Sequence, residues 1–147
     1  MELHDPLVHK FLDDCYNSGI KDPVRFLIDK MPRVYGFLKG AFPRNILPTD
    51  VDGEVEINGH FLRLEFKHEK CLRNGMVPRG QAQAFKSLVN TGKFTVFYIG
   101  HNSNGSVTLL DILAGSETGI KTKRIDPCDE SRLRAACERW AVDVSKK

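Results

Sequence analysis

Apolar residues recur at helical spacing near both ends of the chain and alternate with polar ones in between. Asp5-Pro6 and Asp22-Pro23 each place a capping side chain before a proline, a helix start, and the stripes that follow stop at Gly19 and Pro32. A third stripe covers residues 80–90, with Gly92 as its cap, and a fourth follows Asp129. Residues 33–47 mix aromatic, glycine and basic residues, which predicts a short helix and a loop.

Strand patterns fill the middle of the chain. Alternation over about 50–57 and 60–67, with Asn58-Gly59 between them, predicts a hairpin, because a type I′ turn needs positive φ at both turn positions. Residues 94–100 (FTVFYIG) are apolar on both faces, typical of a central buried strand, and 106–113 form another strand. Residues 70–80 are predicted as a basic loop, and a polar connection precedes Asp129. This order predicts one α/β (α+β) domain over residues 1–147, with a mixed central sheet flanked by helices.

The two-residue turn fixes which hairpin residues face each other. It pairs Ile57 with His60, Glu56 with Phe61, Glu54 with Arg63, Asp52 with Glu65, and Asp50 with Lys67. Alternation then gathers the charged residues on one face and the apolar ones on the other, and a slip of one residue would mix the two sets. A bulge at Gly53 would instead make Asp50 the partner of Glu65.

Asp52 and Glu65 are thus like charges placed directly opposite, an arrangement that destabilises a sheet. Either water screens them on an open face, where Glu54–Arg63 and Asp50–Lys67 form weak surface pairs, or a cation lies between them. Mg²⁺ favours oxygen ligands and commonly binds one or two carboxylates while keeping several waters. Lys67 follows one pleat step from Glu65, and two carboxylates, a metal and an ammonium group suit phosphodiester hydrolysis.

The same residues resemble a known motif. Asp52-Gly53, an apolar strand and then Glu65-Phe66-Lys67 resemble the PD-(D/E)XK nuclease superfamily, and the Pro48 to Gly53 stretch is a looser form of its proline-acid element. Gln81 stands on the next helix, where a glutamine resembles the branch that contains Holliday junction resolvases and VRR-type nucleases. It shares a stripe with Ala84, Phe85 and Leu88, so its side chain is expected to point toward the sheet. The resemblance covers roughly residues 45–100. The first helix departs from it, because it offers Asp13 and Asp14 where many members place a glutamate.

This resemblance implies a restriction-endonuclease-like core, and it implies a role for each residue of the site. Mg²⁺ or Mn²⁺ would be bound by Asp52, Glu65 and the backbone carbonyl of Phe66, with Asp50 as the alternative first ligand. Lys67 would be the catalytic lysine, and Gln81 would belong to the same catalytic site.

Charge and composition add limited information about partners and location. The net charge of +3 points only weakly to nucleic acid, but basic side chains gather next to the acidic face, although basic loops are usually just solvated. The candidate nucleic-acid-binding residues are Lys70, Arg73, Arg79, Lys86 and Arg44. Four cysteines without a CxxC pair, no apolar run at the start and no 18-residue apolar window predict a cytoplasmic protein without membrane association. The resemblance to Holliday junction resolvases adds the expectation that the cell is a bacterium or a phage-infected host. No phosphate-binding glycine loop or zinc-site spacing is present in the sequence, so no nucleotide cofactor is expected.

Together these features predict a Mg²⁺-dependent DNA endonuclease that is selective for DNA structure and similar to a Holliday junction resolvase. A symmetric junction would call for a homodimer, and a small domain would read DNA shape rather than sequence. One alternative is a nuclease acting on DNA ends, single strands or flaps. The other is a non-catalytic nucleic-acid-binding or inhibitory protein on the same scaffold, which would hold DNA equally well in a chelator.

Overall fold

The computed structural model describes residues 5–24 and 52–147, and the chain divides into two compact units, Met1–Asp50 and Val51–Lys147. In the first unit, helix α1 (Pro6–Asn17) starts at the Asp5-Pro6 signal and is followed by Gly19 at φ 76°, as predicted. A second helical stretch begins at Pro23, and the rest of that predicted helix lies outside the described residues. The prediction of one domain over residues 1–147 stays a prediction.

The second unit is built on a five-stranded mixed sheet in the order β1-β2-β3-β4-β5. The strands are β1 (Gly53–Ile57), β2 (His60–His68), β3 (Phe94–His101), β4 (Val107–Ser116) and β5 (Gly119–Ile125). Strands β2 and β3 are parallel, and every other neighbouring pair is antiparallel. The sheet and its helices confirm a mixed α+β class.

The hairpin has the predicted register. Gly53 pairs with Leu64 and Ile57 with His60, and the pairing is regular between them. Asn58 and Gly59 have φ values of 52° and 74°, as a type I′ turn requires. The pairing is regular from Gly53 to Ile57, and Asp52 immediately precedes β1. The alternative that places Asp50 opposite Glu65 concerns a residue outside the described part of the chain.

Two elements of the sequence interpretation need correction. Residues 70–80, predicted as a loop, contain the short helix α3 (Glu69–Arg73), whose N-cap residue His68 accepts a hydrogen bond from the Lys70 amide through Nδ1. The polar connection before Asp129 contains strand β5, where lysine and arginine side chains hide the apolar alternation. Strand β5 forms because its backbone pairs with β4 from Leu110–Ile125 to Ser116–Gly119, although its side chains do not show a clear strand pattern.

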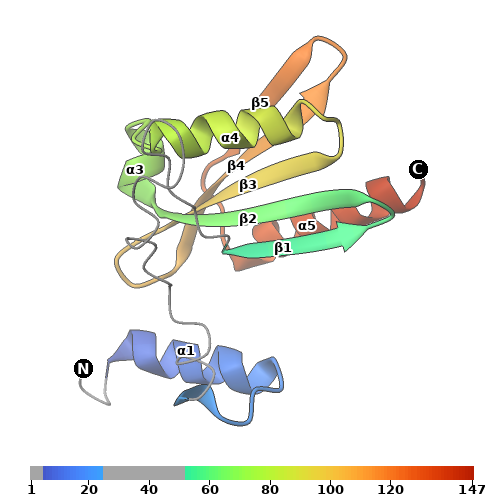
Figure 1. The fold of residues 1–147 in the computed structure, drawn as a ribbon. Coiled ribbons are helices and arrows are strands. Elements are labelled where there is room, and N and C mark those ends of the chain that lie inside the picture. The colour runs from blue at the N-terminus through green and yellow to red at the C-terminus, as the bar shows by residue number, and fades with distance from the viewer. Residues whose placement is uncertain (1–4, 25–51) are drawn as a thin grey trace, which may run out of the picture. The chain divides into compact units, whose positions relative to one another are not determined.

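Helices cover both faces of the sheet, with α3 and α4 (Arg79–Val89) on one face and α5 (Glu130–Ser145) on the other (Figure 1). Helix α5 starts as predicted, because the Asp129 side chain accepts from the Arg132 amide. Each face has its own apolar cluster. The α4 side includes Leu72, Phe85, Val89, Val96, Tyr98 and Leu109, and the α5 side includes Leu62, Phe97, Ile99, Leu110, Trp140 and Val144.

No helix within 5–24 or 52–147 is long and apolar enough to cross a membrane. All four cysteines are free thiols.

Candidate active site

Glu65 is buried in the middle of β2, on the face that α4 covers. Its exposed fraction is 2%, so the interpretation of this hairpin face as an open, water-screened surface is wrong for Glu65. Burying a carboxylate is costly unless it gains partners. The Arg63–Glu54 pair of that interpretation does form, with Arg63 Nε 2.9 Å from Glu54 Oε2, nearer the hairpin turn.

Asp52 is held against β2 by a backbone hydrogen bond. Its Oδ2 atom accepts from the amide of Phe66 at 2.8 Å. This contact fixes the acid at the start of β1, one residue beyond the last ladder pair Gly53–Leu64. The two predicted acidic ligands are therefore brought together, with Asp52 bonded to the residue that follows Glu65.

Two more predicted residues converge on the same carboxylate. Lys67 Nζ lies 3.9 Å from Glu65 Oε2, and Gln81 Nε2 donates to that oxygen at 3.1 Å. Gln81 is in the first turns of α4, so the helix points an amide toward the sheet, as its stripe predicts. One cluster thus gathers Asp52 from just before β1, Glu65 and Lys67 from β2, and Gln81 from α4.

The charges and unpaired atoms of this cluster favour the binding of a cation. Glu65 Oε1 is buried and has no hydrogen-bond partner. Burial, followed by the negative charge of Asp52, raises the pKa of Glu65, and this outweighs the opposing effects of Lys67, Arg63 and a hydrogen bond from the Asp52 backbone. A divalent ion would supply the missing partner and favour the ionised carboxylate, so the residues present fit such an ion.

The donor set is small. In the part of the chain that the structure describes, no three His, Cys, Asp or Glu side chains form a metal-binding group. Asp52 and Glu65 would therefore share an ion with backbone oxygen, for which the Phe66 carbonyl stays the predicted ligand, and with water. Asp50, the alternative first ligand, lies outside the described residues.

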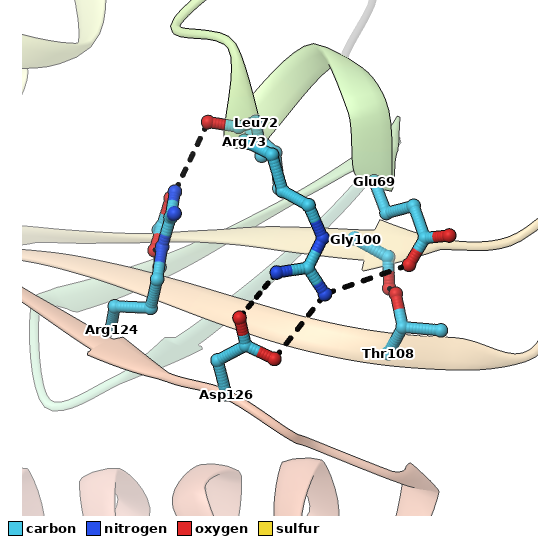
Figure 2. A network of polar contacts seen from close by, with 8 residues as sticks. Glu69, Leu72, Arg73, Gly100, Thr108, Arg124 and Asp126 are labelled. Carbon is cyan, nitrogen blue, oxygen red and sulfur yellow. Dashed lines mark hydrogen bonds and ion pairs between the residues drawn. The ribbon is translucent and has the colours of Figure 1, made fainter.

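The predicted nucleic-acid-binding residues differ in their surroundings. Arg73 is engaged within the protein, because its guanidinium donates to the carboxylate of Asp126 and lies 3.7 Å from Glu69 (Figure 2). The hydrogen bond to Asp126 is the main cause that raises the pKa of Arg73. In this structure Arg73 therefore connects α3 to the residue that follows β5.

The other cations lie on the helices over the Glu65 face. Lys70 is exposed on α3, and Arg79 and Lys86 are exposed on α4, where both line a shallow hollow of about 380 Å³. Arg44 lies outside the described residues. Phosphate contacts by these side chains stay predictions.

Sequence reasoning missed two features of this face. In the sequence Tyr98 is only one residue of an apolar strand, yet it pairs in register with Glu65 and is 4% exposed. Asp111 and Arg124 continue the same row across β4 and β5. The parallel β2–β3 pairing is what aligns Tyr98 with Glu65, and no residue pattern in either strand states that alignment.

Comparison with protein-family models found no match, and neither did comparison with curated proteins or with solved structures.

Proposed function

We propose that this protein is a divalent-metal-dependent phosphodiester hydrolase of the PD-(D/E)XK type, acting on DNA. The observation that carries the proposal is the buried Glu65 carboxylate, with one oxygen lacking a partner and the other within reach of Lys67 and Gln81. A carboxylate kept buried beside a second acid costs stability, and a cation-binding role accounts for that cost.

Each side chain of the cluster has a defined task in this proposal. Asp52 and Glu65, with the Phe66 carbonyl, would hold Mg²⁺ or Mn²⁺, which would polarise the scissile phosphate and lower the pKa of a bound water. Lys67 would donate hydrogen bonds to the charge that develops on the phosphate oxygens. Gln81 would keep the Glu65 carboxylate in one orientation through the hydrogen bond to Oε2.

Within this class we propose a structure-selective endonuclease similar to a Holliday junction resolvase, working as a homodimer in the cytoplasm of a bacterium or a phage-infected cell. The support is the positive charge of Lys70, Arg79 and Lys86 on α3 and α4, which suits a backbone-following contact with DNA. A nuclease for ends, single strands or flaps would use the same site.

A cleavage panel tests the proposal. The substrates are a four-way junction, a flap, a single strand and a plain duplex, each with Mg²⁺, with Mn²⁺ and with a chelator. Lys67→Ala and Glu65→Ala should each lower cutting by about a hundredfold or more while DNA binding survives. Glu138→Ala, which removes an exposed acid from α5, is the matched control and should cut as wild type does.

The outcomes separate the alternatives. Cutting by Glu65→Ala at the wild-type rate would refute the site. DNA binding that is equal with metal and with chelator, and without any cleavage, would identify a non-catalytic binding protein. Preference for plain duplex or ends over the junction would remove the resolvase assignment and leave the nuclease assignment in place.

A further inference from the structure

Three buried polar atoms without hydrogen-bond partners belong to three neighbouring side chains. They are Glu65 Oε1 on β2, Gln81 Oε1 on α4 and the hydroxyl of Tyr98 on β3, and they are all such atoms found among residues 5–24 and 52–147. An unpaired buried polar group is destabilising, because it loses its hydrogen bonds to water and gains none in return. Three orphans gathered around one carboxylate indicate a common partner.

The three residues are tied together by contacts already present. Gln81 donates to Glu65 at 3.1 Å, and Tyr98 is the register partner of Glu65 in the neighbouring strand. The Tyr98 ring also packs against Phe85 of α4, with ring centroids 5.7 Å apart. The tyrosine is therefore locked between the strand that carries Glu65 and the helix that carries Gln81.

Their hydrogen-bonding capacities balance around one water molecule. The hydroxyl of Tyr98 keeps its proton at neutral pH, as tyrosine hydroxyls ordinarily do, so it can donate one hydrogen bond. Glu65 Oε1 and Gln81 Oε1 are acceptors. A water accepts one hydrogen bond from Tyr98 and donates two, one to each Oε1, which is the usual three-bond state of a buried water.

We infer that Tyr98 is a positioning residue for Glu65, which it orients through one buried water shared with Gln81. Each carboxylate oxygen has two lone pairs, so a water on one side of Oε1 leaves the other side for a cation. The inference rests on the proposed metal site only for its effect on metal binding. The Tyr98–Glu65 link itself exists without metal and can be tested separately.

The link is tested by a double-mutant cycle on unfolding in urea, without metal. Tyr98→Phe keeps the ring and removes the hydroxyl, and Glu65→Met removes the carboxylate while keeping a similar length. If the link exists, the factor by which Tyr98→Phe changes the unfolding equilibrium constant should differ about tenfold between the wild-type and Glu65→Met backgrounds. Factors that agree within about twofold would overturn the link, since they would mark an isolated hydroxyl.

The positioning role is tested by Mn²⁺ affinity at constant pH. Tyr98→Phe should raise the Mn²⁺ Kd about tenfold, the usual effect of losing a group that orients a metal ligand. Tyr16→Phe, at an 83%-exposed tyrosine on α1, is the matched control and should leave the Kd unchanged. A purely structural tyrosine would leave it unchanged in both variants.

Failure of this inference is distinguishable from failure of the proposed function. If Glu65→Met abolishes Mn²⁺ binding but Tyr98→Phe binds as wild type does, the positioning role is overturned and the metal site stands. If wild type and Glu65→Met bind Mn²⁺ equally, the metal site falls, and the positioning role falls with it. The urea cycle then decides whether the water-bridged link exists.

Discussion

Asp111 and Arg124 form a bidentate ion pair across β4 and β5, with both nitrogen–oxygen distances at 2.7 Å. Arg124 also donates to the carbonyl of Leu72 at 3.1 Å, which ties α3 to the far edge of the sheet (Figure 2). The pair stands in the same cross-strand row as Glu65 and Tyr98. A row of polar side chains therefore crosses the sheet beneath α3 and α4. At the β5 end of this row, Asp111 and Arg124 satisfy each other by hydrogen bonds.

Removing Arg124 should be costly for stability. Arg124→Gln leaves the Asp111 carboxylate, 9% exposed, without its partner, and we expect a loss of about 2 kcal/mol after allowing for the partial exposure of the arginine. Urea unfolding at pH 7 measures it. Arg134→Gln breaks an exposed pair on α5 and should cost less than about 0.5 kcal/mol. Equal losses in the two variants would show that the Arg124–Asp111 pair contributes no more to stability than an exposed pair does.

The Arg73–Asp126 contact should give a pH-dependent contribution to stability. Hydrogen bonding by Arg73 lowers the pKa of Asp126 below its usual 3.8, so the contribution is present above that value and is lost as pH falls through the lower, folded-state pKa. Asp126→Asn should therefore melt at a lower temperature than wild type at pH 7, and the gap should close in strong acid. Asp143→Asn, at an exposed aspartate of α5, serves as control. A gap that persists unchanged at pH 2 would refute the assignment.

Glu65 should have the opposite pH dependence. Its folded-state pKa lies above 4.5, so the protonated form is favoured in the fold, and metal-free stability falls as pH rises from that value through the folded pKa. Glu65→Gln should lack this fall and be more stable than wild type at pH 7 by on the order of 1 kcal/mol. Urea unfolding in a chelator between pH 4 and 8 measures both. Parallel profiles would count against a strained buried carboxylate.

Excess Mn²⁺ should reverse that ranking. An ion that binds only the folded state stabilises it by mass action, so wild type should gain stability with Mn²⁺ concentration while Glu65→Gln gains little. Thermal melting across a Mn²⁺ series at pH 7 provides the measurement. A similar gain in both proteins would show that the ion binds elsewhere.

Gly100, near the end of β3, has no room for a larger side chain. A Cβ there would lie 2.7 Å from Leu109 Cγ, and Leu109 is fully buried, so Gly100→Ala should destabilise the fold by about 1–3 kcal/mol. Gly80→Ala, in the first turn of α4 with open space around the site, should instead be neutral or stabilise by about 0.5–1 kcal/mol. Chemical unfolding of the two variants compares them directly, and a neutral Gly100→Ala would show that Leu109 can yield.

The sequence was sufficient wherever local chemistry decides the structure. Asn58-Gly59 fixed the hairpin register, which brought Asp52 toward Glu65, and Asp129 marked the start of α5. The stripe of α4 predicted correctly that Gln81 faces the sheet. Each of these depends on a turn, a cap or a periodicity within a few residues.

Long-range pairing was beyond the same reasoning. The hairpin pattern alone could not say that α4 would bury Glu65, because that depends on where a helix fourteen residues later packs. The alignment of Tyr98 with Glu65 comes from the parallel pairing of β2 with β3. The sequence predicts Arg73 as a DNA contact because its partner within the protein, Asp126, lies far along the chain and cannot be recognised from the local pattern. Residue type without tertiary context gives no access to these contacts.

Strand β5 has one more consequence for how copies of this protein can meet. It is an outer strand of the sheet, and Lys121, Lys123 and Arg124 follow each other closely along it. Among the strands that the structure describes, β5 has a neighbour on one side only. Cationic side chains on such an edge discourage another chain from adding a strand there, which protects against aggregation. The lysine and arginine side chains that make β5 resemble a polar connection in the sequence therefore also make this edge of the sheet an unfavourable place for strand pairing between two copies of the chain.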